Sequence, residues 1–162
     1  MTTNAGDNNG FEVSAMNACA DDGSAAADMD SGTGPPHSCA SVTKDRHLFW
    51  GYGFAIPPSA TVNDIEVRLD AWADGATSAP FLCVELSWDG GASWTVDKTT
   101  PTLGTSEAAF ILGGVGDSWG RQWAASELSD TDFRVRVTTR SPLASRDFYL
   151  DWLAVQVNYS AP

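Results

Sequence analysis

Two segments of strict two-residue alternation constrain the fold of this chain more than any other feature. Between residues 62 and 73, the apolar side chains of Ile65, Val67 and Leu69 alternate with charged ones. Residues 81–88 repeat the pattern, and the Asp-Gly pair that follows them is a favoured two-residue hairpin turn. Because successive side chains of a strand point to opposite faces, each segment predicts a β-strand with one buried face.

Other segments add strands, and none gives a convincing helix. The apolar run His47–Ile56, closed by two prolines, predicts a central strand. Residues 124–128 are long enough for one helical turn only and predict a connector. About eight short strands separated by Gly, Pro and Asp turns predict an all-β antiparallel sandwich of jelly-roll type. The remaining predicted strands are Trp94–Lys98, Ala108–Leu112, Phe133–Thr139 and Phe148–Tyr159.

Composition divides the chain into a short linker and one domain. Residues 1–10 and 20–38 are rich in small and polar residues without periodicity. We therefore expect a flexible linker over residues 1–10, and a single sandwich over residues 11–160 that carries a long surface loop. The first residues lack the parts of a secretion signal, which suggests a boundary inside a larger protein. The chain has no apolar run long enough to span a membrane.

The net charge of the chain argues against negatively charged partners. Twenty-one acidic and nine basic side chains give a net charge of −12. Such a surface repels phosphate backbones and anionic membranes, so we expect no nucleic-acid partner and no membrane insertion. The same surplus of carboxylates suits a calcium ion, and it also keeps an exposed domain soluble.

The three cysteines permit at most one internal disulfide. Their spacing matches no metal-ligand pattern. Cys39 and Cys83 fall in or beside predicted strands, so we predict that these two are bridged. This pairing leaves Cys19 without a partner cysteine in the chain, and the sequence leaves open whether its thiol is free.

The hairpin segment Ser87–Trp94 fits the pattern S-x-D-x-G-x-x-W. It resembles the Asp-box of sialidases and other extracellular β proteins, over eight residues. In that motif the Ser and Asp side chains bond backbone groups across the turn, away from any catalytic centre. The resemblance therefore implies a structural role, and one copy does not indicate a sialidase propeller.

A wider resemblance covers most of the chain. The blocks that carry it are similar to a jelly-roll module of bacterial surface proteins and phage tail proteins, and such a sandwich resembles carbohydrate-binding modules. The resemblance implies a non-catalytic accessory or structural module that is secreted or is part of a cell surface or a virion. It carries no ligand residues over. The blocks are residues 17–23, Gly53–Pro57, Ala60–Leu69, Leu112–Trp123, Phe133–Val137 and Leu150–Val157.

Calcium is the sharpest chemical hypothesis for the acidic loop. Asp21, Asp22 and Asp28 concentrate carboxylates near a turn, and carbohydrate-binding sandwiches often hold a structural calcium at such a loop. The spacing departs from that of an EF-hand. A solvated acidic loop is the alternative.

Exposed tryptophans are the candidates for sugar binding. Alternation directs Trp72 outward, and Trp119 and Trp123 lie in a Gly-rich segment where exposure is easy. The apolar face of a pyranose packs on such rings. Burial in the core is the alternative for each of them.

The sequence shows no sign of an enzyme active site. The histidines are His37 and His47, and no G-x-S-x-G nucleophile elbow is present. A carboxylate pair for glycoside hydrolysis is not readable from sequence. Two functions remain: a carbohydrate-binding or adhesion module, or an assembly domain of a surface stalk, filament or phage appendage.

Overall fold

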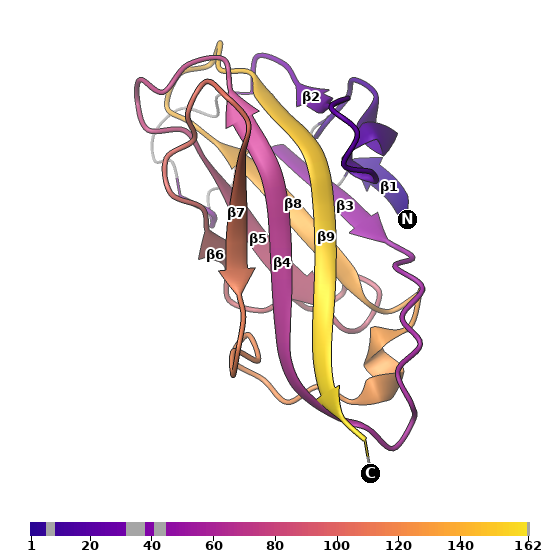
Figure 1. The fold of residues 1–162 in the computed structure, drawn as a ribbon. Helices are drawn as coiled ribbons and strands as arrows, with labels where there is room; N and C mark the ends of the chain where they lie inside the picture. Colours follow the sequence, from indigo (N-terminus) through magenta and orange to yellow (C-terminus); the bar gives the residue numbers. More distant parts are fainter. Residues whose placement is uncertain (6–8, 32–37, 41–44, 162) are drawn as a thin grey trace.

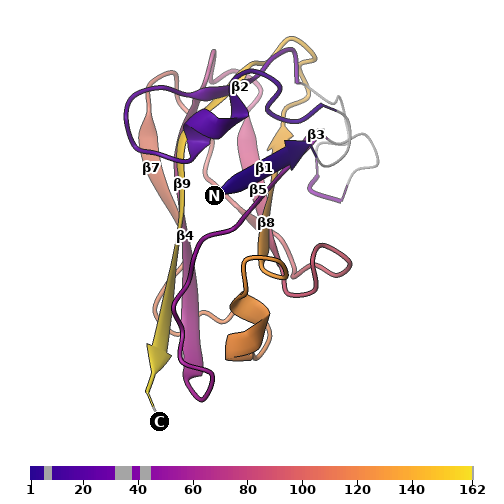
Figure 2. The ribbon, with the colours of Figure 1, turned by 90° about the vertical axis from the view of Figure 1, so that its right-hand side faces the viewer.

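The computed structural model describes residues 1–5, 9–31, 38–40 and 45–161. Two antiparallel sheets pack face to face, as the edge-on view of Figure 2 shows. The five-stranded sheet has the order β1-β3-β8-β5-β6, and the four-stranded sheet has the order β2-β9-β4-β7. The predicted all-β antiparallel sandwich is confirmed. Its strands are β1 (Thr2–Ala5), β2 (Ala26–Asp28), β3 (Asp45–Trp50), β4 (Thr61–Ala73), β5 (Phe81–Ser87), β6 (Lys98–Thr99), β7 (Ala108–Gly113), β8 (Arg134–Arg140) and β9 (Phe148–Ser160).

Two short 3-10 helices accompany the strands in the described part of the chain. They are η1 (Ala15–Ala18) and η2 (Ala125–Leu128), and η2 lies where the sequence predicts a one-turn connector. No described helix has the length and apolar character needed to cross a bilayer.

The long strands β4 and β9 form the spine of the four-stranded sheet. Each has 13 residues, and they pair antiparallel along almost their whole length. Ile65, Val67 and Leu69 of β4 are completely buried, as the alternation predicts. The residues between them are less buried and lie on the opposite face of the sheet. Figure 1 looks onto this sheet, with β4 and β9 in front.

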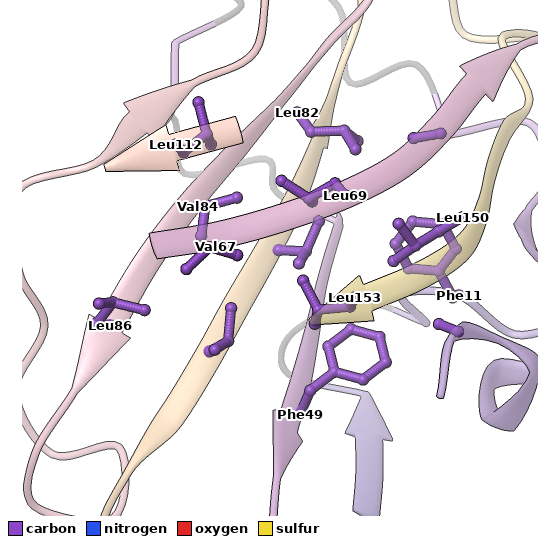
Figure 3. Close-up of a cluster of buried hydrophobic side chains, with 14 of the residues drawn as sticks. Phe11, Phe49, Val67, Leu69, Leu82, Val84, Leu86, Leu112, Leu150 and Leu153 are labelled. Atoms are coloured by element: carbon purple, nitrogen blue, oxygen red, sulfur yellow. The ribbon is translucent and has the colours of Figure 1, made fainter. Parts of the chain in front are cut away.

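The core lies between the two sheets. Figure 3 shows Val67 and Leu69 from β4 pointing toward Leu82 and Val84 from β5, while Phe49 of β3 packs below Leu153 of β9. All of these side chains are at most 2% exposed. Each contributes about 1.5–3 kcal/mol to folding through the hydrophobic effect. This packing holds β4 and β9 as a rigid platform.

Strand β3 is shorter than the apolar run predicts. It ends at Trp50, because Gly51 and Gly53 adopt left-handed backbone angles, with φ of 74° and 70°. A left-handed residue breaks the extended geometry of a strand. The run up to Ile56 therefore leaves the sheet, although Phe54 and Ile56 still pack against the core.

The first residues belong to the sandwich, so the prediction of a flexible linker over residues 1–10 is wrong for residues 2–5. These residues form β1 and pair with β3. Strand β2 likewise lies inside the predicted loop 20–38 and pairs with β9. Strands of three or four residues are too short for a periodic pattern to be recognised in the sequence.

The predicted disulfide is confirmed. Cys39 and Cys83 are bonded, with 5.8 Å between their Cα atoms, and Cys19 is a free thiol. The bridge ties residue 39 to β5, so it adds a covalent link on the five-stranded sheet.

The hairpin after β5 is held by its own side chains. The Ser87 hydroxyl accepts the Gly91 N–H at 2.8 Å, and the Asp89 carboxylate accepts the Ser93 N–H at 2.8 Å. These bonds fix the turn locally and leave the Ser and Asp side chains engaged in structure.

Candidate functional site

The outward face of the four-stranded sheet carries a patterned set of side chains, and we call it the outer face. In Figure 1 the reader looks onto this sheet, with β7, β4 and β9 side by side in front. The register places Arg68 of β4 between Ile111 of β7 and Ala154 of β9. The outer face is formed by Glu66, Arg68, Asp70, Trp72, Ile111, Tyr149, Trp152, Ala154 and Gln156.

A groove of about 360 Å³ opens on the outer face. Its position follows from the register, because the small side chain of Ala154 lies beside the long side chains of Arg68 and Trp152. Apolar and polar groups therefore meet in one depression. The groove is lined by Glu66, Arg68, Ile111, Trp152, Ala154, Val155 and Gln156.

Arg68 connects the groove to the carboxylates beside it. Its guanidinium donates two hydrogen bonds to Asp70, at 2.9 and 2.8 Å, and lies 4.7 Å from the ring centroid of Trp152. The hydrogen bond to Asp70 raises the pKa of Arg68, so the group is a permanent cation. A bidentate pair also fixes the orientation of the guanidinium over the ring.

A second aromatic position lies farther along the same two strands. Trp72 of β4 and Tyr149 of β9 stack with 5.2 Å between ring centroids and 15° between ring planes. Both residues are half-buried. The predicted outward direction of Trp72 agrees with this arrangement, and the pair adds an aromatic surface beyond Trp152.

The exposure predicted for the other two tryptophans is wrong. Trp119 and Trp123 are 3% and 6% exposed. The Trp119 indole N–H donates to the Ile65 carbonyl at 2.9 Å, and that of Trp123 donates to the Ser118 carbonyl at 2.8 Å. A loop tryptophan whose N–H finds a carbonyl partner is readily buried in the core. Neither ring offers a face to a ligand.

Sequence reasoning missed Trp152, the aromatic wall of the groove. A two-residue alternation counted from Leu150 directs Trp152 inward. The register shifts instead, because Asp70 pairs with Trp152 and Ala71 pairs with Leu150, which leaves Asp151 as an extra residue in β9. Such a β-bulge reverses the alternation that follows it. The inward residues Leu150 and Leu153, three positions apart, were the available signal.

A group of carboxylates lies beside the groove. Asp21, Asp70 and Glu107 offer oxygens that are all within 4.8 Å of one another. Partial loss of hydration raises the pKa of Glu107, and the charges of Asp151, Asp70 and Asp21 raise it further. Negative charge is therefore concentrated at this point of the outer face.

The metal ligands predicted from the sequence do not converge. Of that set, only Asp21 joins the carboxylate group. Asp22 accepts the Ser24 N–H at 2.9 Å within its own exposed turn. Asp28 is completely buried, where it accepts hydrogen bonds from Ser31 and Thr139. Sequence proximity failed here because β2 carries Asp28 into the sandwich.

His47 is engaged in structure. It is buried, and burial lowers its pKa to about 4, so the ring is neutral near pH 7. Its Nδ1 accepts the Phe11 N–H at 3.0 Å, and its Nε2 lies 2.5 Å from the Thr3 hydroxyl. Both ring nitrogens are occupied. His37 lies outside the described residues.

Comparisons with known proteins give a structural likeness at low identity. No protein-family model matches the chain, and no curated protein matches it. A structure described as CBM4, a carbohydrate-binding module, aligns with 13% identity and a TM-score of 0.39 over 82% of this chain and 93% of that one. A structure of Clostridium thermocellum endo-1,4-β-D-xylanase 10B, with its CBM22-1 and GH10 modules in complex with xylohexaose, aligns with 11% identity and a TM-score of 0.41. That alignment covers 85% of this chain and 26% of the xylanase chain.

Proposed function

We propose that this chain is a non-catalytic carbohydrate-binding module that takes its ligand on the outer face of the four-stranded sheet. The observation that carries the proposal is the groove in which the Trp152 ring lies beside fixed polar groups. Ligand sites commonly combine an aromatic surface with a few polar groups of set orientation.

The outer face supplies both kinds of contact that a sugar needs. The apolar face of a pyranose packs on an aromatic ring, and Trp152 and the Trp72–Tyr149 stack provide two such positions along β4 and β9. The hydroxyls of the sugar need donors and acceptors beside the ring. Arg68, Glu66 and Gln156 supply them within the groove.

The charge of this face indicates a neutral glycan. Glu66 lines the groove, and Asp21, Asp70 and Glu107 lie beside it. Such a cluster repels sulfate groups and uronic acids, whereas it accepts hydrogen bonds from neutral sugar hydroxyls. We therefore expect a preference for uncharged polysaccharides.

The disulfide supports a place of action outside the cytoplasm. The Cys39–Cys83 bridge is stable in an oxidising compartment and rare in the cytosol. We propose that the module is part of a secreted or surface-bound protein and that its glycan binding serves adhesion.

A glycan array followed by quantitative binding tests the proposal. We expect Trp152→Ala to weaken binding of the best neutral glycan roughly tenfold or more, because a central aromatic anchor is lost. Trp50→Ala is the matched control, since Trp50 is also half-buried and lies 4.8 Å from an arginine, on the other sheet. Equal loss in both variants, or no binding to any glycan, contradicts the proposal.

An assembly domain of a stalk, filament or phage appendage is the second candidate. Strand β7 favours it, because β7 is the edge of its sheet and carries Ile111, which is 49% exposed. Exposed edge strands pair with other chains. Light scattering decides between the two: concentration-dependent association that Ile111→Lys abolishes supports assembly, and a strict monomer argues against it.

A further inference from the structure

Strand β7 leaves one edge of the four-stranded sheet open. It pairs with β4 on one side and is the last strand of the sheet on the other side, as Figure 1 shows. Natural edge strands are usually protected by lysine, proline or a bulge. β7 has the sequence AAFILG, without a charged residue or a proline, and its register with β4 contains no shift. An unprotected edge of this kind is suited to pairing with a further strand.

Two hydrogen bonds show which residues of β4 turn their backbone groups toward β7. The Gly114 N–H donates to the Ile65 carbonyl at 3.3 Å, just after β7. The Ala73 N–H donates to the Gly104 carbonyl at 2.9 Å, just before β7. Backbone groups of a strand alternate between its two sides. The odd-numbered residues of β4 therefore bond to β7.

The residues of β7 that face the open edge follow from this alternation. Leu69 of β4 pairs with Phe110, so Phe110 turns its N–H and C=O groups toward β4. Ala109, Ile111 and Gly113 turn theirs the other way, toward the open edge. Ala109 and Ile111 are also exposed. β7 thus presents three residues whose backbone groups are directed at a neighbour.

These three residues match one another when two copies of β7 run antiparallel. About a two-fold axis at Ile111, each Ile111 lies opposite its own copy, and each Ala109 lies opposite Gly113 of the second copy. Each of the three pairs can exchange two backbone hydrogen bonds, as hydrogen-bonded pairs of an antiparallel ladder do. The small residues on either side leave room for the two Ile111 side chains to pack together on the outer face. The open edge is therefore complementary to itself.

The same register keeps the acidic residues of the two copies apart. Each chain has a net charge of −12, and Glu107 immediately precedes β7. Glu107 is four positions from Ile111, so the two Glu107 residues are separated by eight positions, about 27 Å at about 3.4 Å per residue. Charges are screened beyond about 8 Å at physiological ionic strength. The two acidic ends therefore do not oppose the contact directly.

We propose that two copies of this chain pair through β7, with a two-fold axis at Ile111. The four strands of each copy then form one continuous antiparallel sheet of eight. Such a contact uses the same edge in both copies and leaves no β7 edge for a third. The pair is therefore closed, unlike a stalk or filament, which needs a contact that repeats without end.

The pairing would join the two grooves into one binding face. Ile111 lines the groove and lies at the axis, so the second copy places its own Ile111 beside it. The strand order β9-β4-β7-β7-β4-β9 separates the two Trp152 residues by five strand spacings, about 24 Å at about 4.8 Å each. A glycan that reaches both grooves would bind the pair more tightly than one copy. This consequence rests on the proposed function, whereas the pairing itself does not.

Sedimentation equilibrium of the whole chain, without any glycan, tests the pairing. We expect the mass to rise with concentration from 17.2 kDa toward twice that value and no further. Ile111→Lys places two like charges at the axis and should abolish association. Val96→Lys is the matched control, because Val96 is also an exposed valine-type side chain, 82% exposed, and lies outside β7. It should associate as the unaltered chain does.

Cysteine cross-linking tests the register. Ile111→Cys should form a disulfide between copies under mild oxidation, because directly paired Cα atoms are about 5.5 Å apart and disulfides need about 4.4–6.8 Å. Ala109→Cys is the matched control on the same strand. Its two copies would be four positions apart, roughly 14 Å along the strands, which is too far for a disulfide. Cys19 is present in both variants, so its own reactions are common to them.

Three results would overturn the proposal. They are a strict monomer at millimolar concentration, masses that grow beyond two copies, and cross-linking of Ala109→Cys as fast as that of Ile111→Cys. None of these measurements contains a glycan, so their failure leaves the glycan-binding test unaffected. Absence of glycan binding, in turn, contradicts the proposed function and leaves the pair of copies standing.

Discussion

At the scale of single residues, Asp28 has the most unusual chemistry in the described chain. It is completely buried, and it accepts hydrogen bonds from the Ser31 hydroxyl and, at 2.7 Å, from the Thr139 hydroxyl. Asp45 lies beside it and is also buried. Burial, together with the neighbouring charge of Asp45, raises the pKa of Asp28 to about 8. Asp28 is therefore protonated in the folded protein near pH 7.

This proton makes stability depend on pH. The pKa of Asp28 is about 8 in the folded state and near 3.8 in the unfolded chain, so between these values the folded state holds a proton that the unfolded state lacks. The free energy of unfolding therefore falls as pH rises from about 4 to about 8, by at most about 1.4 kcal/mol per pH unit. Asp28→Asn should flatten this dependence in urea unfolding at pH 5, 6.5 and 8.

Asp30→Asn is the control for that series. Asp30 is exposed two positions away, and asparagine tolerates its left-handed φ of 52°. Its profile should follow that of the unaltered chain. An Asp28→Asn profile as steep as that of the unaltered chain contradicts the assignment of the proton to Asp28.

The directions of the candidate site's side chains could be predicted from the sequence only where the residues lie on a regular strand. Alternation in β4 gives the outward direction of Trp72 and of Asp70. Trp119 is different, because the Ile65 carbonyl that receives its N–H comes from a strand 54 residues away. The outward direction of Trp152 was not predicted, because a bulge depends on how two strands pair and cannot be read from the sequence of one strand.

At the scale of elements, the end of β7 depends on one glycine. Gly113 has a left-handed φ of 83°, and a Cβ atom there would overlap the Ile65 carbonyl and lie 2.7 Å from the Trp119 Nε1. That carbonyl is the acceptor of the Trp119 indole. Gly113 thus allows β7 to lie against β4 while Trp119 closes the core beneath them.

Gly113→Ala should destabilise the fold by about 1–3 kcal/mol from the strained backbone, with a further loss from the overlap. Urea unfolding measures the change, and near-ultraviolet circular dichroism reports the environment of Trp119. Gly104→Ala is the control, since its Cβ meets nothing within 4 Å and its φ is not left-handed. Equal stability of the two variants would argue against this role for Gly113.

The long strands were predictable as elements, and the short ones were not. β4 and β5 have clear alternation and a buried face, so their ranges agree with the sequence to within about one residue. β1, β2 and β6 have two to four residues and exist through their pairing with β3, β9 and β5. Pairing partners depend on the whole topology, which local pattern does not contain.

At the scale of the whole molecule, the two sheets present different outward faces. On the five-stranded sheet, Arg136 binds Glu85 at 2.7 Å and lies 4.0 Å from the ring centroid of Trp94. Arg134 and Arg136 of β8 do not face the charged residues of β4, because β8 and β4 lie in different sheets. The outer face of the four-stranded sheet instead holds the groove, which Arg68 and Trp152 line together with their neighbours.

The indole N–H resonances of the seven tryptophans test glycan binding on the outer face most directly. Each indole gives its own signal in an NMR titration with the neutral oligosaccharide selected on an array. We expect the signals of Trp152 and Trp72 to shift with ligand concentration, while those of the buried Trp119 and Trp123 stay fixed. Shifts confined to Trp50 and Trp94, on the opposite sheet, would contradict it.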